Sequence, residues 1–531
     1  MESEDRPRRR AFFLIRIPRT AALALVTLAL LAPPCQAQTP PARTGRLAAA
    51  YPAIDSLMRE FAAQEHVPGI AYGIIVDGKL AHVGTAGLRE VASRAPVDTG
   101  TVFRIASMTK CFTAAAILQL RDAGRLSLDD PAERYVPELR GLKYPTSDSP
   151  RITIRHLLSH SAGFPEDNPW GDRQLAVTDQ QMSRMLRGGI PFSTAPGTSY
   201  EYSNYGFAIL GRIVTNVSGQ PYTRYVAEHL LRPLGMRATT LQTKEVPAAR
   251  LAHGYRWQDG AWLEEEQLPD GAFGSMGGML TSVSDLARWV GFMLDAWPPR
   301  NGADRGPLRR ASRREMQQVA RYTGAGAATD SAGQLTLSAG GYGYGLRITT
   351  TCRFDRIVHH SGGLPGFGSI MRWLPEYGVG IVALGNRTYT GWSTVTNRAL
   401  ELLAQTGGLV RREPQPSPVL LARRDQVSRL VTRWDDALAD SIAAVNLYLD
   451  ESKDRRQAAI DSLRRGAGGD CRNEGPFVAE NRLRGRWRMR CTSGDLAVAI
   501  TLAPTEPPLV QSLEVEPIAR DEDLGPRGSC R

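Results

Sequence analysis

The sequence contains very little lysine. Only five of its 65 basic residues are lysines, at positions 79, 110, 143, 244 and 453, and the remaining 60 are arginines. Arginine keeps its proton in a protein, whereas a buried lysine can lose its proton and act as a base. Because this chain uses arginine where only positive charge is needed, a lysine within a chemical motif is a candidate for proton transfer.

Long apolar stretches are also missing. The N-terminal run "AALALVTLALLA" has 12 residues, and a helix needs about 20 to cross a bilayer. The run follows an arginine-rich segment that resembles the twin-arginine export pattern, and small residues follow it. We therefore expect an export signal over residues 1–37, with an uncleaved anchor as the alternative. The mature protein is then periplasmic or secreted and has no stable membrane span.

Two further absences concern nucleic acids and metals. The net charge of +11 falls to +8 without residues 1–37, and no basic run is interleaved with aromatic residues, which argues against nucleic-acid binding. His156 and His160 are four apart but lack the Glu of a His-Glu-x-x-His motif. His359 and His360 are adjacent, so they point to opposite faces of a strand. The sequence therefore predicts no metal and no cofactor.

The order of strand and helix patterns indicates the fold class. Two apolar runs joined at Asp77-Gly78 predict a hairpin. Residues 126–330 are mostly helical in pattern, with Pro and Gly interruptions, and strand patterns return from residue 340 before a final helix. We expect an α/β (α+β) domain over residues 45–405. In it, helices flank an antiparallel sheet and a helical lobe is inserted between the two halves of the sheet.

A Pro-rich segment, residues 406–418, is the predicted linker to a second part. Residues 419–531 show helical spacing of apolar residues and then an alternating strand pattern, so we expect a small α+β accessory module without a catalytic role. Cys471 and Cys491 lie in this module in an oxidising setting, which predicts a disulfide between them. Cys530 is then unpaired, and Cys111 is expected to be a small buried hydrophobe.

Lys110 follows Ser107 by three residues in "FRIASMTKCFTAAAILQL", which has a helical pattern. Residues three apart on a helix share a face, so the hydroxyl and the amine can meet. A lysine that takes the serine proton turns the serine into a nucleophile. The spacing alone is a weak signal, and a surface helix with a solvated Lys110 is the alternative.

Two other segments supply what such a pair needs. Tyr202 and Asn204 follow a Gly-rich approach in "PGTSYEYSNYGFAILG" and can present a phenol and an amide together; a packed aromatic and a helix cap are the alternatives. The segment "HSGG" from His360 to Gly363 ends a predicted strand. The amides of Gly363 and Ser107 could form an oxyanion hole, and a simple glycine turn is the alternative there.

Together the three segments resemble the serine β-lactamase and penicillin-binding superfamily. They are most similar to the branch related to class C β-lactamases, which includes D,D-peptidases, D-aminopeptidases and esterases. "ITIRHLLSHSAGFP", "LLRPLGMRATTL" and "GSMGGMLTSVSDLARW" extend the resemblance over residues 50–405. It implies a β-lactamase/transpeptidase-like fold in which Ser107 attacks the substrate, Lys110 takes its proton and Tyr202 shares the relay.

The resemblance also implies the substrate-binding residues. Asn204 holds the substrate amide, and His360, Ser361 and Gly362 lie on the substrate-binding strand. True class C β-lactamases usually carry lysine where this chain has His360, and we expect the histidine to be only partly protonated near neutral pH. Family members with His-x-Gly are often peptidases acting at D-residues, or esterases.

We therefore expect an exported serine hydrolase that acts through an acyl-enzyme on esters or D-amino-acyl peptides and amides. Its substrate is a small molecule or peptide of cell-wall origin. A true class C β-lactamase and a non-catalytic penicillin-binding or sensor module are the alternatives. A Ser-His-Asp hydrolase is disfavoured, because the sequence has no Gly-x-Ser-x-Gly elbow.

Overall fold

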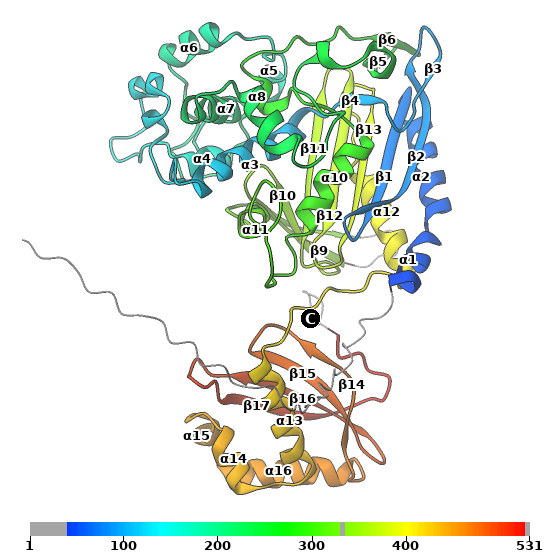
Figure 1. Ribbon diagram of the computed structural model, residues 1–531, viewed down its shortest axis with the longest axis vertical. Coiled ribbons are helices and arrows are strands. Elements are labelled where there is room, and N and C mark those ends of the chain that lie inside the picture. The colour runs from blue at the N-terminus through cyan, green and yellow to red at the C-terminus, as the bar shows by residue number, and fades with distance from the viewer. Residues whose placement is uncertain (1–39, 330–334, 526–531) are drawn as a thin grey trace, which may run out of the picture. The chain divides into compact units, whose positions relative to one another are not determined.

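The computed structural model describes residues 40–329 and 335–525 (Figure 1). The predicted export signal and Cys530 lie outside the described residues. Within the described ranges, no helix is long and apolar enough to cross a membrane.

A nine-stranded antiparallel sheet forms the centre of the larger part of the chain (Figure 1). Its strands are β1 (Gly69–Val76), β2 (Lys79–Glu90), β3 (Ala95–Pro96), β8 (Arg321–Thr329), β9 (Leu335–Tyr342), β10 (Arg347–Thr351), β11 (Ile357–Leu364), β12 (Phe367–Leu374) and β13 (Val379–Gly385). Their order is β3-β2-β1-β13-β12-β11-β10-β9-β8. The early β1 thus pairs with the late β13, with Tyr72 opposite Ala383. The expected antiparallel sheet is confirmed.

Both faces of the sheet are covered by helices. All eight residues of β1 are buried because alternate side chains enter different cores. Ile70, Tyr72 and Ile74 pack with one group of helices, and Ala71 and Ile75 with another. The first face is covered by α1 (Pro40–Ala48), α2 (Tyr51–Gln64) and α12 (Ser393–Gln405), and the second by α10 (Val283–Leu294) and α3 (Thr109–Asp122).

A helical lobe is inserted between β3 and β8, as expected. Its elements are β4 (Val102–Arg104), η1 (Ala106–Met108), α3, α4 (Ile154–Leu158), α5 (Asn168–Gly171), α6 (Asp179–Gly188), α7 (Asn204–Ser218), α8 (Tyr222–Val226), β5 (Tyr255–Gln258), β6 (Ala261–Glu264), α9 (Gly274–Gly277), β7 (Leu280–Ser282), α10 and α11 (Arg310–Met316). Helix α3 is buried on nearly all sides, because Ala114, Ala115 and Ala116 let neighbouring elements approach closely. Its N-terminus is therefore held rigidly at the boundary between lobe and sheet.

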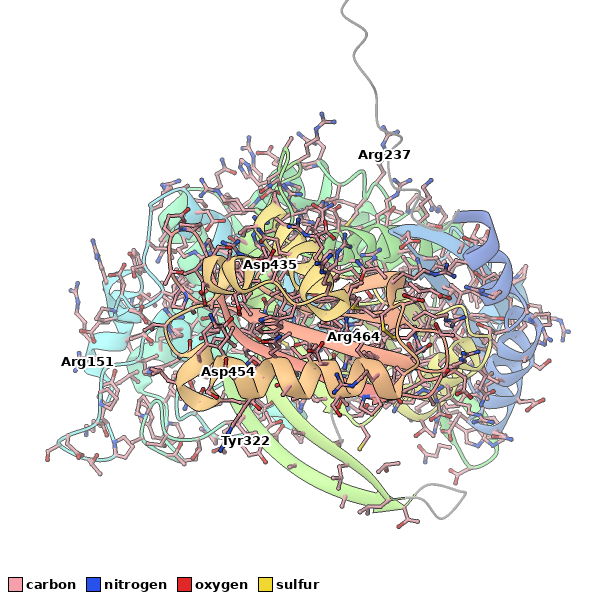
Figure 2. The ribbon with its side chains drawn as sticks, turned by 90° about the horizontal axis from the view of Figure 1, so that it is seen from below. Arg151, Arg237, Tyr322, Asp435, Asp454 and Arg464 are labelled. Carbon is pink, nitrogen blue, oxygen red and sulfur yellow. A yellow bond between two sulfur atoms is a disulfide. The ribbon has the colours of Figure 1, made fainter. Side chains whose placement is uncertain are left out.

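The C-terminal part has a sheet and core of its own. Its helices are α13 (Pro418–Thr432), α14 (Asp436–Ile442), α15 (Leu447–Asp450) and α16 (Lys453–Gly466), and its strands, in sheet order, are β14 (Arg472–Ala479), β15 (Arg484–Arg490), β16 (Asp495–Leu502) and β17 (Val510–Ile518). Trp487 and Met489 alternate with arginines on β15 and are buried against α13 and α16. Helix α16 carries Asp454, which is exposed, and Arg464, which donates a hydrogen bond to the carbonyl oxygen of Thr432 at the end of α13 (Figure 2).

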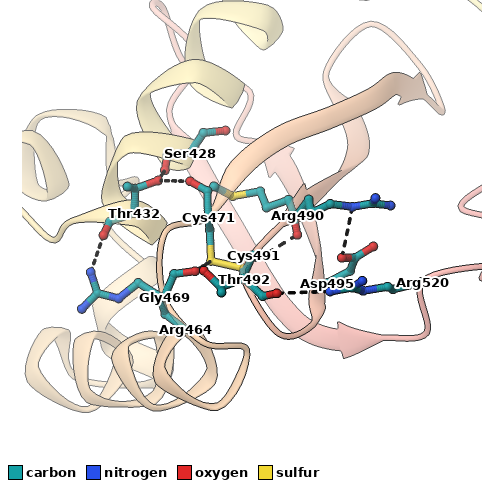
Figure 3. Close-up of a disulfide and its surroundings, with 11 residues drawn as sticks. Ser428, Thr432, Arg464, Gly469, Cys471, Arg490, Cys491, Thr492, Asp495 and Arg520 are labelled. Carbon is teal, nitrogen blue, oxygen red and sulfur yellow. Dashed lines mark hydrogen bonds and ion pairs between the residues drawn. A yellow bond between two sulfur atoms is a disulfide. The ribbon is translucent and has the colours of Figure 1, made fainter.

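The predicted disulfide between Cys471 and Cys491 is confirmed (Figure 3). It joins the residue before β14 to the residue after β15, and the carbonyl of Cys471 accepts a hydrogen bond from Oγ1 of Thr432 on α13. The bridge therefore ties the sheet to the first helix. Cys111 is free and buried, as expected, and Cys352 is disulfide-bonded.

Replacing both Cys471 and Cys491 by alanine should destabilise the C-terminal part by about 3 kcal/mol, because a loop of about 20 residues is then open in the unfolded chain. Hydrogen exchange of the amides in β15 and β16 measures the loss. Ester hydrolysis per folded molecule should stay unchanged, since neither cysteine belongs to the predicted Ser107 site. Exchange as slow as in the wild type would show that the bridge contributes no stability.

Candidate active site

Ser107 lies on the turn η1, which joins β4 to α3. Ala106 before it has a φ of 48°, a left-handed conformation that is costly for a residue with a Cβ. The turn directs the chain into α3, so Lys110 follows Ser107 in the first turn of that helix. Lys110 is fully buried, and its Nζ lies 3.1 Å from Oγ of Ser107. The two predicted residues meet, and the alternative of a solvated Lys110 is wrong.

The hydrogen bonds of Lys110 leave one direction open. Nζ donates to Oδ1 of Asn204 at 2.6 Å and to the carbonyl oxygen of Met276 at 2.8 Å, and both oxygens can only accept. A neutral amine has two N–H groups and one lone pair. With both N–H groups occupied, the lone pair faces the hydroxyl of Ser107. This is the geometry of a nucleophile beside its base.

Burial also sets the protonation of Lys110. Removal from water disfavours the ammonium form and lowers the pKa to about 7, although Asp172 and Asp167 act in the opposite direction. Arg347 lowers the pKa further. All three hydrogen-bond partners of Nζ are neutral groups. Near neutral pH a large fraction of Lys110 is therefore the free base.

Tyr202 places its phenol beside the same hydroxyl. It lines the same cavity as Ser107, Ser107 acts on its pKa, and its ring centroid lies 4.9 Å from Nζ of Lys110. Burial raises the pKa of Tyr202, so the phenol stays protonated. A neutral hydroxyl accepts and donates at the same time, which suits a proton relay better than a base.

Asn204 holds Lys110 in place. Its Oδ1 accepts from Lys110, and its Nδ2 donates to Oδ1 of Asn168 at 3.0 Å. The cap of α7 is Ser203, so the alternative that Asn204 serves as the helix cap is wrong. Asn204 is fully buried. It does not line the cavity in front of Ser107, whereas Asn168 does. The contact of Asn204 with substrate stays a prediction.

His360 on β11 is neutral. Its Nε2 is 3.1 Å from the hydroxyl of Tyr342, and its Nδ1 is 2.6 Å from the carbonyl oxygen of Ser361, so Nδ1 carries the proton and Nε2 accepts. Burial, with smaller effects from Arg347 and Lys110, lowers the pKa of His360 to about 3. The expectation of a partly protonated His360 is therefore wrong, because the ring is buried away from water and lies near the guanidinium of Arg347.

The glycines of β11 let this strand approach the nucleophile. A Cβ on Gly362 would lie 2.1 Å from the carbonyl oxygen of Ile105, close to Ser107, and a Cβ on Gly363 would lie 2.6 Å from the ring of Tyr389. A side chain at position 362 would push the strand away from the η1 turn, and one at position 363 would displace Tyr389. Ser361 is exposed on the same strand and lines the cavity in front of Ser107.

This cavity has a volume of about 360 Å³ and carries charges on its walls. Its lining consists of Ser107, Asn168, Pro169, Asp172, Tyr202, Arg347, His360, Ser361, Gly363 and Tyr389. Five of the eight residues predicted for the site from sequence line this cavity, namely Ser107, Tyr202, His360, Ser361 and Gly363. The other three, Lys110, Asn204 and Gly362, are not part of the lining. The predicted residues are thus brought together by η1, α7 and β11.

Arg347 and Asp172 were missed by sequence reasoning. Arg347 opens β10, and its guanidinium lies 5.7–5.9 Å from the ring centroids of Tyr200, Tyr202 and Tyr342. Among the described residues, no carboxylate lies within ion-pair distance of Arg347. The strand pattern "YGYGLRITT" with its single charged residue could have drawn notice to Arg347. Asp172 lies on a loop, where no sequence pattern marks it.

The histidines considered as metal ligands have other contacts. Nδ1 of His156 accepts the N–H of Thr153 at the start of α4. Nδ1 of His160 accepts the N–H of Ser203 at 3.1 Å, and its ring lies 4.2 Å from that of Tyr202. In the part of the chain that the structure describes, no three His, Cys, Asp or Glu side chains are grouped to hold a metal ion.

Comparison with known sequences agrees with this geometry. The family model described as Beta-lactamase matches residues 54–406. Protein flp of Staphylococcus aureus (strain MW2) is 29% identical over 337 residues, which cover 63% of this chain and 62% of that protein. The D-alanyl-D-alanine-carboxypeptidase/endopeptidase AmpH of Escherichia coli (strain K12) is 28% identical over 342 residues, or 63% of this chain and 84% of AmpH. The chain thus spans less than two thirds of the length of flp.

Solved structures show a similar fold. The octameric penicillin-binding protein homologue from Pyrococcus abyssi has a TM-score of 0.56 at 23% identity, over 89% of this chain and 94% of that one. A class C beta-lactamase has a TM-score of 0.53 at 22% identity, over 66% of this chain and 96% of that one. At these identities the likeness concerns the fold alone.

The rate of ester hydrolysis should report the pKa of Lys110. With p-nitrophenyl acetate, kcat/KM should rise with pH to a plateau, with a midpoint of about 7, because only the neutral amine accepts the serine proton. Lys110→Arg should abolish nearly all acylation, since arginine keeps its proton. As a control, His360→Gln should leave the midpoint unchanged, because His360 is already neutral throughout this range. A midpoint that moves with His360→Gln would contradict this assignment.

Proposed function

The chain belongs to the beta-lactamase family, and within it we propose an exported serine hydrolase that acts through an acyl-enzyme on Ser107 and cleaves D-amino-acyl peptides and esters. The observation that carries the proposal is the position of Nζ of Lys110, which lies 3.1 Å from Oγ of Ser107 and has only neutral hydrogen-bond partners. A module that only binds penicillin-like ligands has no need of a lysine held as a free base, which disfavours the sensor alternative.

Acylation follows from the arrangement of three side chains. Oγ of Ser107 attacks the substrate carbonyl while its proton passes to Nζ of Lys110. The negative charge on the carbonyl oxygen is stabilised by the amides of Ser107 and Gly363. Tyr202 then delivers its proton to the leaving amine or alcohol and regains one from the ammonium of Lys110, which holds the proton taken from Ser107. Water completes the cycle by attacking the ester on Ser107, with the same groups as base and relay.

Arg347 supports a peptide substrate that ends in a carboxylate. The leaving group lies on the side of Tyr202, which supplies its proton, and Arg347 lies beside the ring of Tyr202. Its guanidinium has no carboxylate partner in the described parts of the protein and can hold a C-terminal carboxylate by two parallel hydrogen bonds. AmpH, a relative, is a D-alanyl-D-alanine carboxypeptidase by name. We propose cell-wall peptides as the natural substrate class.

Class C β-lactamase activity is the second candidate function, and Arg347 is the residue that favours it. A β-lactam carries a carboxylate, and the charge that lysine supplies in those enzymes is here available from Arg347 and not from the neutral His360. Export is supported by the N-terminal signal pattern and by the disulfide between Cys471 and Cys491, because disulfides persist in oxidising compartments.

The direct test of the proposed function is covalent labelling. A fluorescent fluorophosphonate should label the wild-type protein, and peptide mapping should find the adduct on Ser107. Ser107→Ala should lose both the label and the turnover of p-nitrophenyl acetate, because no other nucleophile has a base beside it in the cavity. Labelling that persists in Ser107→Ala would refute the assignment of the nucleophile.

Arg347→Gln should lower kcat/KM for a D-alanyl-D-alanine peptide about 100-fold, the equivalent of a lost charged hydrogen bond. The loss on p-nitrophenyl acetate should be far smaller, since that ester has no carboxylate. Arg353→Gln, on the exposed turn after β10, is the matched control and should retain activity on both. Equal losses on peptide and ester in Arg347→Gln would contradict the role of Arg347 in carboxylate binding.

A further inference from the structure

Asp172 is a buried carboxylate on the wall of the active-site cavity. It follows α5, is 4% exposed, and lines the same cavity as Ser107. Oδ2 accepts a hydrogen bond from the hydroxyl of Tyr389 at 3.1 Å. Within the described residues, Oδ1 has no hydrogen-bond partner and no arginine or lysine lies within 4 Å of either oxygen. One oxygen of this carboxylate is therefore available to a ligand.

The charge of Asp172 is poorly compensated by the protein. Burial raises the pKa of Asp172 to about 6, and Asp167 and Glu166 act in the same direction. Lys110 is the cation that lowers it, and with a pKa of about 7 Lys110 is only partly protonated near neutral pH. At neutral pH the carboxylate is still mostly ionised. Burying an unpaired charge is costly, and a bound cation would remove that cost.

Asp172 and Arg347 lie on different walls of the cavity. Arg347 belongs to the wall of β10 and β11 and packs beside Tyr202, whereas Asp172 is bonded to Tyr389 and follows the segment that carries Asn168. In the proposed reaction the leaving group lies on the side of Tyr202. The acyl residue then lies on the opposite side, toward Asn168 and Asp172.

A second acceptor stands near Asp172 on this wall. Oδ1 of Asn168 accepts one hydrogen bond, from Asn204, and a carbonyl oxygen has a second lone pair. Asn168 and Asp172 are joined by a backbone hydrogen bond at 3.1 Å, so their side chains belong to the same short segment. A primary ammonium carries a positive charge and three N–H donors, so it can bind the Asp172 carboxylate and the Asn168 amide oxygen together. An acylated amine has one N–H and no charge, so it fits this pair of acceptors less well.

We propose that Asp172 binds a primary ammonium group on the acyl residue of the substrate and makes the enzyme selective for D-amino-acyl substrates with a free amine. The inference rests on the proposed function, because an acyl residue occupies this wall only if Ser107 is the nucleophile. The ammonium belongs either to the α-amine or to the side chain of a diamino residue, and the substrates below separate these two sources.

Three p-nitroanilides test the inference with the full-length protein. D-alanine p-nitroanilide offers an α-ammonium, N-acetyl-D-lysine p-nitroanilide a side-chain ammonium, and N-acetyl-D-alanine p-nitroanilide neither. Near neutral pH, kcat/KM for one of the two substrates with an ammonium should exceed that for N-acetyl-D-alanine p-nitroanilide about tenfold or more, as expected for a charged hydrogen bond. The preferred substrate identifies which amine binds.

Asp172→Asn should reduce this preference to about onefold, because asparagine keeps an oxygen for Tyr389 but has no charge. Glu166→Gln is the matched control. Glu166 also acts on Asp172 electrostatically but does not line the cavity that contains Ser107, so the preference should persist in that variant. Fluorophosphonate labelling of Ser107 in each variant confirms that the site is folded.

Several results would overturn the inference. It is wrong if the wild type hydrolyses all three anilides with equal kcat/KM, or if Asp172→Asn keeps the wild-type preference. If Ser107 is labelled but no anilide is cleaved, each anilide is tested for slowing the labelling, and equal protection by all three also overturns it. Failure of the wild type to label at Ser107 is a different result: it refutes the proposed function, and the inference falls with it.

Discussion

Burial of Lys110 among neutral hydrogen-bond acceptors is the interaction on which the active site depends. A lysine with a carboxylate partner would stay protonated and could not take a proton from serine. Here Asn204 and the carbonyl of Met276 take the two N–H groups, and desolvation lowers the pKa to about 7. The turn η1, helix α7 and helix α9 each supply one partner, so these three parts of the lobe must pack together before Lys110 can act on Ser107.

The cavity around this pair is polarised by two charged residues that have no ion-pair partner within residues 40–329 and 335–525. Arg347 lies on the strand side and Asp172 on the lobe side, and the two act on Lys110 in opposite directions. Because His360 is neutral, this site differs from that of class C β-lactamases, which usually carry a charged lysine at the same position. In the proposed reaction these two charged residues bind the ends of the substrate, and Ser107, Lys110 and Tyr202 carry out the chemistry.

Much of this arrangement follows from local sequence, and some of it does not. Two-residue alternation and the turn at Asp77-Gly78 predict the sheet, and spacing by three on a helix predicts that Ser107 meets Lys110. The protonation of His360 could not be predicted, because it depends on burial by distant segments. Asp172 accepts a hydrogen bond from Tyr389, which is 217 residues away in the chain, and no local sequence pattern predicts such a contact. Arg347 is a different case, because it is the single charged residue of the strand pattern "YGYGLRITT", but its place beside Tyr202 depends on the pairing of distant segments.

The scarcity of lysine makes the central claim directly measurable. Protein labelled with 15N and 13C only at lysine has five side-chain amines, and NMR can follow their titration with Lys110→Arg to assign the relevant signal. The account predicts that the signal of Lys110 titrates near pH 7. If that signal instead titrates near the ordinary lysine value of about 10.4, Lys110 is an ammonium ion at neutral pH and cannot be the base that activates Ser107.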